Sequence, residues 1–170
     1  MASERAHSID RPVSWRIKER PGFTTVEFVG DIDERAEFAE LRLRLRGQVV
    51  FHLGEVHRIN SMGVRAWVSF IRDLPNVSDL QLSHCSPTVV AHLNMVANFR
   101  GQASLRSFYA PYVCSGCGRE EERLLDVKAQ TITTRASDLP IHTCAGCGED
   151  MTFADVPERY LSFLTTADAV

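Results

Sequence analysis

Four of the five cysteines stand in two Cys-x-x-Cys pairs, Cys114 with Cys117 and Cys144 with Cys147. Zn(II) prefers four thiolates in a tetrahedron, and each pair can bring two sulfur atoms to the same ion. A glycine follows each pair, where it lets the backbone turn and direct N–H groups toward sulfur. Four protein ligands leave no open coordination position. The spacing therefore predicts one structural zinc ion rather than a catalytic one.

Two disulfides or a redox dithiol are the alternatives to zinc. Residues 1–12 carry charges and no apolar stretch, so we expect no secretory signal there. No run approaches the roughly 20 apolar residues that a membrane-spanning helix needs. We therefore expect a cytoplasmic protein, where thiols stay reduced and metal binding is favoured over disulfides. The fifth cysteine, Cys85, is expected to be a small buried side chain.

A second candidate is the stretch Asn60-Ser61-Met62-Gly63-Val64, which follows an apolar run and begins a helical pattern. The first turn of a helix leaves backbone N–H groups without partners. The hydroxyl of Ser61 can cap them. A phosphate on Ser61 would meet the same donors and the positive end of the helix dipole. The residues alone thus leave both capping and phosphorylation open.

Strand and helix patterns alternate over the first 110 residues. Alternation of apolar and polar residues, or short apolar runs, predicts strands at 13–18, 23–29, 49–53, 77–82 and 105–109. Helices are expected after Asp33 as a cap, from Ser61, and from Pro87 after Ser86. Residues 41–46 also alternate, which leaves a strand open there. This order predicts an α/β fold, a mixed sheet with helices packed against it.

Short strands are also expected around the cysteines, at 124–127, 131–133 and 151–153. This arrangement resembles a zinc ribbon over residues 112–153. A module with so few apolar residues needs the metal for much of its folding energy. The predicted organisation is therefore a flexible N-terminal tail at 1–11, an α/β domain at 12–110, a β zinc ribbon at 111–154 and a C-terminal tail with a short helix at 155–170. In that tail, Tyr160, Phe163 and Leu164 stand at helical spacing. They are expected either to pack onto the core of the protein (docked core) or to form a motif that binds a partner.

The charge distribution argues against nucleic acid as a partner. Residues 1–110 hold 14 basic and 12 acidic side chains, whereas residues 111–170 hold 5 basic and 10 acidic ones. Nucleic-acid affinity comes largely from Lys and Arg on phosphates. Four thiolates with one Zn(II) would add about −2 to an already acidic ribbon. A nucleic-acid-associated regulator acting through the ribbon is therefore kept only as an alternative.

Residues 13–109 resemble the STAS domain, the family of bacterial anti-sigma-factor antagonists and sulphate-transporter tails. The resemblance is carried by Gly30-Asp31-Ile32-Asp33, Asn60-Ser61-Met62-Gly63-Val64 and Ser83-His84-Cys85-Ser86-Pro87-Thr88-Val89. It implies that a kinase phosphorylates Ser61, that a phosphatase reverses this, and that only the unphosphorylated form holds the partner. The implied partner surface contains Asn60, Met62, Gly63 and Arg65. Asn60 stands where the family signature has aspartate, Met62 where it has a small hydroxyl residue, and the segment between residues 33 and 49 is short for the family.

The chain carries no phosphate-cradling glycine loop, nucleophile elbow, zinc-protease helix or paired carboxylates typical of an enzyme. We therefore expect a non-enzymatic signalling adaptor that binds a protein, either an anti-sigma-factor kinase or another signalling protein. A scaffold module that has lost its switch is the alternative from another class. We expect no membrane association, and a homodimer remains open.

Overall fold

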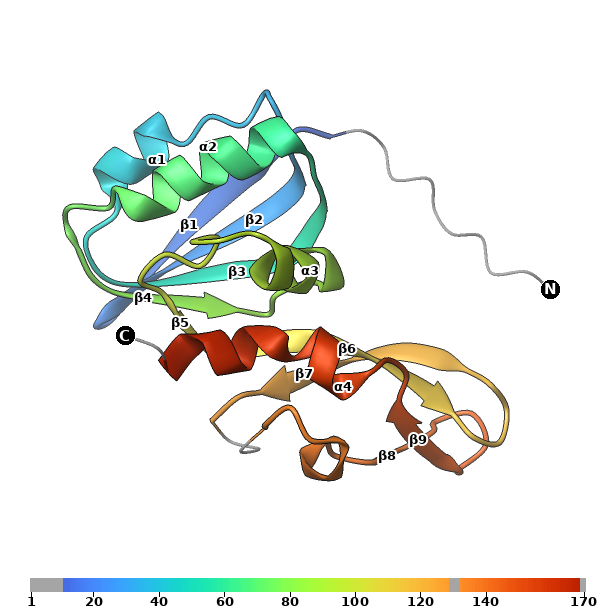
Figure 1. Ribbon diagram of the computed structural model, residues 1–170. Helices are drawn as coiled ribbons and strands as arrows, with labels where there is room; N and C mark the ends of the chain where they lie inside the picture. Colours follow the sequence, from blue (N-terminus) through green and yellow to red (C-terminus); the bar gives the residue numbers. More distant parts are fainter. Residues whose placement is uncertain (1–10, 129–131, 169–170) are drawn as a thin grey trace.

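The computed structural model describes residues 11–128 and 132–168. The first two strands predicted from the sequence form a hairpin (Figure 1). The Pro21-Gly22 turn joins β1 (Ser14–Arg20) to β2 (Phe23–Ile32) in antiparallel register. Gly22 has a φ of +89°, a left-handed conformation that favours glycine. The N-terminal tail lies outside the described residues except for residue 11.

The first sheet has five strands in the order β1-β2-β3-β4-β5. Its other strands are β3 (Gly47–Ile59), β4 (Val77–Ser83) and β5 (Ser104–Leu105). β2, β3, β4 and β5 are parallel, and only β1 is antiparallel to its neighbour. The sheet is therefore mixed, and the α/β prediction is confirmed.

Helices α1 (Ala39–Arg44) and α2 (Ser61–Arg72) cover one face of this sheet (Figure 1). Their apolar faces meet the sheet around Trp67, which is fully buried and donates from Nε1 to the carbonyl of Phe99 at 2.9 Å. The ring of Phe28 packs edge-on against Trp67 with centroids 5.6 Å apart. The 3.6-residue periodicity of α2 thus produces the core contact that the sequence predicts.

The predicted start of the first helix, directly after Asp33, is wrong. The structure places α1 at Ala39–Arg44, without a side-chain cap, and residues 41–44 are helical rather than extended. The carboxylate of Asp33 instead accepts hydrogen bonds from the backbone N and the Nε of Arg35, both at 2.9 Å. A carboxylate engaged two residues away is not available to cap the later helix.

Helix α3 (Pro87–Met95) begins as predicted, with Ser86 as its cap. The Ser86 hydroxyl accepts from the N–H of Val89 at 3.3 Å and donates to the carbonyl of Val56 at 2.7 Å. The same side chain therefore caps the helix and ties it to β3.

The second sheet is antiparallel, with four strands in the order β7-β6-β9-β8. The strands are β6 (Ser107–Cys114), β7 (Glu120–Asp126), β8 (His142–Thr143) and β9 (Asp150–Phe153). The single strand predicted at 105–109 is wrong. Leu105 ends the first sheet, whereas β6 belongs to the second, and the boundary predicted between residues 110 and 111 falls inside β6.

A strand was also expected at 131–133. Thr131 lies outside the described residues, and Ile132 and Thr133 belong to no strand. The pairing that closes the sheet is made instead by two residues, His142 and Thr143, against β9. A strand this short has no periodicity that a sequence pattern can reveal.

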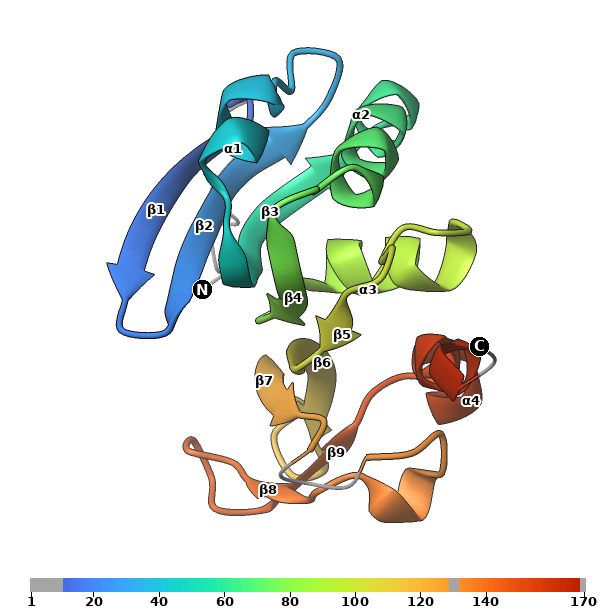
Figure 2. The same ribbon diagram turned by 90° about the vertical axis from the view of Figure 1, so that its left-hand side faces the viewer.

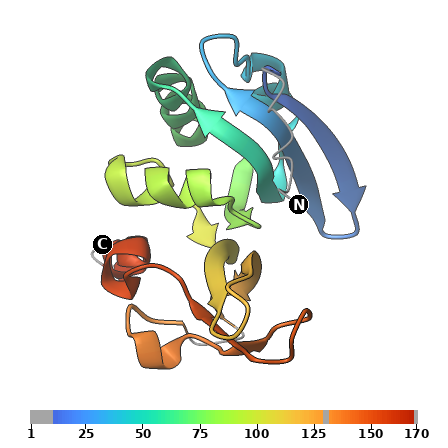
Figure 3. The same cartoon turned by 90° about the vertical axis from the view of Figure 1, so that its right-hand side faces the viewer.

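The C-terminal segment packs between α3 and the second sheet (Figures 2 and 3). It contains α4 (Pro157–Tyr160) and the 3₁₀ segment Ser162–Asp168. Phe163 is buried against Phe108, with ring centroids 5.3 Å apart. The docked-core alternative is therefore confirmed for this tail. Among the described residues, no helix combines the length and hydropathy needed to cross a membrane.

Candidate functional site: a four-cysteine centre and the first turn of α2

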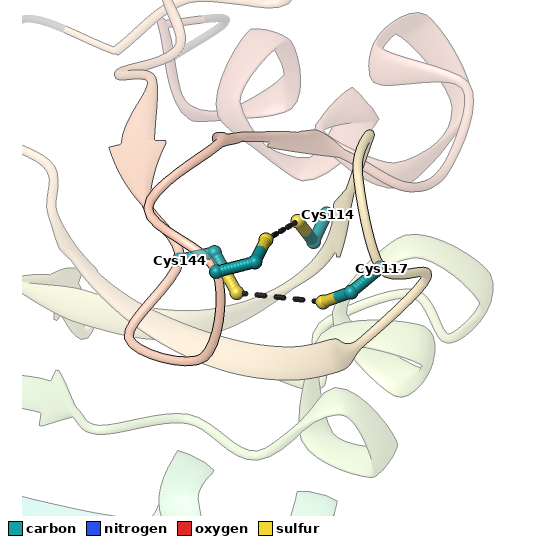
Figure 4. A group of neighbouring side chains, drawn as sticks. Cys114, Cys117 and Cys144 are labelled. Atoms are coloured by element: carbon teal, nitrogen blue, oxygen red, sulfur yellow. Dashed lines mark hydrogen bonds between the residues drawn. The ribbon is translucent and has the colours of Figure 1, made fainter.

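The two Cys-x-x-Cys pairs come together at one end of the second sheet. Their four sulfur atoms all lie within 4.8 Å of one another. Cys114 Sγ lies 3.4 Å from Cys147 Sγ, and Cys117 Sγ lies 3.7 Å from Cys144 Sγ. Figure 4 shows the labelled sulfurs of Cys114, Cys117 and Cys144 turned toward a common centre. The cluster can hold a metal ion.

The two pairs sit in matching turns. Gly118 and Gly148 both have left-handed φ angles, +69° and +81°. The N–H of Gly118 donates to the carbonyl of Cys114 at 3.1 Å, and the N–H of Gly148 donates to the carbonyl of Cys144 at 2.9 Å. These glycines therefore close the turns, as predicted, but their own N–H groups do not reach sulfur. Another glycine makes such a contact: the N–H of Gly146 lies 3.4 Å from Cys144 Sγ.

The cluster shifts the pKa values of two of its thiols in opposite directions: contacts with the sulfur atoms of Cys114, Cys117 and Cys144 raise the pKa of the Cys147 thiol to about 12. Backbone N–H groups of Cys117 and Gly116 lower the pKa of the Cys114 thiol to about 6. In contrast, burial raises the pKa of Cys85, which is completely buried in the first core. Cys85 is therefore an inert core side chain, as the sequence predicts.

The second candidate is the first turn of α2. Asn60, not Ser61, is the cap: its Oδ1 accepts from the N–H of Gly63 at 2.8 Å, and its carbonyl accepts from the N–H of Val64 at 2.8 Å. The capping role considered for Ser61 is therefore wrong. Ser61 is the first helical residue, and it is exposed.

The other predicted partner-surface residues surround Ser61. Met62 is 53% exposed, and Arg65 is exposed one helical turn beyond Ser61. Gly63 is buried and contributes backbone only. The first turn therefore presents a hydroxyl, an apolar side chain and a cation on the same helix end.

Sequence reasoning missed Glu34. Its Oε2 accepts from Asn60 Nδ2 at 2.7 Å, which lowers the pKa of this carboxyl. Asp31, Asp33, Glu34, Arg58 and Asn60 line a cavity of about 300 Å³ beside the helix start. No spacing rule connects residues 31–34 with Asn60, because the parallel pairing of β2 with β3 brings them together.

Comparison with known proteins adds no identity: no protein-family model matches this chain, and no curated protein matches it.

Proposed function

We propose that this protein is a non-enzymatic signalling adaptor of the STAS, anti-sigma-factor-antagonist type. Its first sheet and helices form a docking platform, and a protein partner binds at the start of α2. The exposed Ser61 hydroxyl at the first helical position carries this proposal. Since Asn60 already caps the helix, Ser61 has no structural task there and is free for modification.

Phosphorylation of Ser61 would change the chemistry of this surface. The N–H groups of Ser61 and Met62 have no intrahelical partner, because the first four N–H groups of a helix have no preceding carbonyl. A phosphate meets these donors and the positive end of the dipole. Arg65, four residues on, lies on the same helix face and supplies a cation. The phosphate would add about −2 charge beside the apolar side chain of Met62 and disrupt partner binding.

Zinc is the metal that fits the cysteine cluster best. Four thiolates at about 2.3 Å from one ion stand about 3.8 Å apart at the corners of a tetrahedron. The two sulfur contacts of 3.4 and 3.7 Å are close to that spacing. With four sulfur ligands the ion would have no position for water or substrate, so its role would be structural.

The switch is tested by affinity capture from native lysate with wild type, Ser61→Ala and Ser61→Asp. Ser61→Ala should retain the partner and Ser61→Asp should lose it. Ser69→Asp is the matched control. Ser69 is exposed on α2 two turns later, and this substitution adds the same charge as Ser61→Asp. Equal capture by all variants would overturn the switch and leave a scaffold module.

The metal is tested by elemental analysis of the purified chain. We expect one zinc ion per chain in wild type and in Cys85→Ala, and loss of zinc in Cys117→Ser. Zinc in Cys117→Ser at the wild-type level would overturn the four-thiolate assignment.

Phosphorylation is tested separately. Phosphopeptide mass spectrometry of protein from native cells should locate phosphate on Ser61.

A further inference from the structure

A cleft of about 580 Å³ lies between the two sheets. Its floor is the face of the first sheet opposite α1 and α2, where Thr25 and Val50 are buried. Its opposite wall comes from the beginning of β6 and the end of β7. This volume is in the range of small-molecule sites in proteins. The topology thus creates a cleft, open on one side to solvent, at the junction of the two sheets.

Two histidines meet in this cleft. His52 lies on β3, whose register places it beside Ser83 of β4, and His84 follows Ser83. The two imidazole rings have centroids 4.6 Å apart. Burial lowers the pKa of both, so both are neutral at pH 7 and can donate or accept hydrogen bonds.

The backbone of His84 is held in an unusual conformation. Its φ is +53°, in the left-handed region that few residues other than glycine adopt. The hydroxyl of Ser107 accepts from its N–H at 2.9 Å, and the Ser83 hydroxyl lies 2.7 Å from its Nδ1. These contacts occupy Nδ1 and leave Nε2 for another partner. Strained residues locked in this way cluster at binding sites.

Two cations line the same cleft, Arg20 at the end of β1 and Arg106 between the two sheets. Within the described parts of the chain, neither guanidinium forms an ion pair or hydrogen bond. Arg106 is close enough to both imidazoles to contribute to their lowered pKa values. Asp126 also lines the cleft, with its Oδ1 accepting from the N–H of Lys128 at 3.1 Å. Two cations against one carboxylate leave the cleft net positive.

The rim of the cleft is apolar. Phe23 and Leu124 both line it, and each is 40% exposed. Because they come from β2 and β7, they stand on opposite walls. An apolar body between them would be removed from water on both sides, which contributes about 25 cal/mol per Å² of apolar surface.

We propose that this cleft binds a small organic anion. Arg20 and Arg106 hold the carboxylate or phosphate group, the two imidazoles add hydrogen bonds, and an apolar body lies between Phe23 and Leu124. The site is independent of the adaptor function. His52 lies on β3 and Asn60 directly follows the end of this strand, eight residues later and about 26 Å away at 3.3 Å per residue. Ser107 and Cys114 are at opposite ends of β6.

Calorimetric titration of the full zinc-loaded chain tests this site. The probes are benzoate, phenyl phosphate, inorganic phosphate and the neutral benzyl alcohol. Benzoate or phenyl phosphate should bind, and the stronger of the two identifies the anionic group. Benzyl alcohol lacks the charge and should bind at least about tenfold more weakly, because it cannot form charge-assisted hydrogen bonds with the two guanidinium groups. Equal binding of benzyl alcohol, or binding of inorganic phosphate alone, would overturn the proposal.

A matched pair of variants locates the binding. Arg106→Gln should lower the affinity for the probe by at least about tenfold, because it removes a charge-assisted contact. Arg16→Gln is the control: Arg16 is an exposed cation of β1, 3.8 Å from the carboxylate of Glu27 and outside the cleft. Imidazole NMR signals of His52 and His84 should shift with the probe. Unchanged signals, unchanged affinity in Arg106→Gln, or no heat with either organic anion at about 10 mM would also overturn it.

Discussion

The backbone of Gly63 lies directly against the carbonyl group of Ile32. A Cβ at position 63 would stand 1.9 Å from that oxygen, closer than any side chain tolerates. The N–H of Asn60 donates to the same carbonyl at 3.2 Å. The start of α2 is therefore fixed to the end of β2, and this contact sets where Ser61 emerges.

Replacing Gly63 should consequently destabilise the fold. Gly63→Ala must push α2 away from β2, and we expect the free energy of unfolding to fall by about 3 kcal/mol or more. Ser61→Ala, in the same turn but exposed, should change it by less than about 0.5 kcal/mol. Urea denaturation measures both. A loss below about 1 kcal/mol in Gly63→Ala would mean that α2 moves freely.

Removing the cap of α2 should lower the free energy of unfolding by less than replacing Gly63, and the two effects can be measured separately. Asn60→Ala removes the hydrogen bond to the Gly63 N–H and should reduce the unfolding free energy by about 1 kcal/mol. Asn60→Ser retains a capping oxygen and loses only the exposed contact with Glu34, so its stability should remain close to wild type. Chemical denaturation compares the two. Equal losses would show that Glu34, rather than the cap, holds this turn.

Removing the metal should affect the two sheets unequally. Chelation should abolish amide protection over 112–153, because the segment that carries the cysteines has few apolar residues and depends on the metal. Strands β3 and β4 should keep their protection, since their core around Trp67 is far larger. Hydrogen exchange with mass spectrometry reads both regions in one experiment, and added zinc should restore the pattern. Unaltered exchange around the cysteines would contradict the prediction.

The histidine pair predicts a dependence of stability on pH. A histidine whose pKa is lowered by folding takes up its proton more readily in the unfolded chain. The stability it contributes is complete above the ordinary pKa of 6.5 and declines as pH falls through that value toward the folded pKa. The charged groups around the pair are Arg106, Glu27 and Lys18.

His84→Asn removes this titration while tolerating the left-handed backbone. Between pH 7 and pH 5, the unfolding free energy of wild type should fall more steeply than that of His84→Asn. Urea denaturation at several pH values measures the slopes. Parallel slopes would show that His84 titrates normally in the folded chain.

Local patterns were sufficient for several elements. The strand predicted from residue 23, the periodicity of α2 and the Ser86-Pro87 helix start each involve residues close in sequence, and all three are confirmed. The cysteine cluster was equally predictable, because the chemistry of a thiolate site fixes the ligand type and the spacing within each pair.

Features that depend on long-range contacts were not predictable in this way. The late start of α1 follows from the hydrogen bonds between Asp33 and Arg35. Residue preferences at helix starts do not show that Asp33 binds Arg35 instead of capping a helix. His52 and His84 are separated by a helix and a strand, and only the parallel pairing of β3 with β4 brings them together. The pattern of each strand shows which face it buries, but it does not show which other strand lies beside it.

The continuity of β6 has a practical consequence. Phe108 forms a backbone bridge with Cys85 at the end of β4, whereas Tyr112 packs against Phe153 of β9, yet both belong to one eight-residue strand. A truncation between residues 110 and 111 would divide that strand, expose apolar surface on each fragment and leave both prone to aggregation. A study of either half should therefore use the whole chain, or place the cut outside β6.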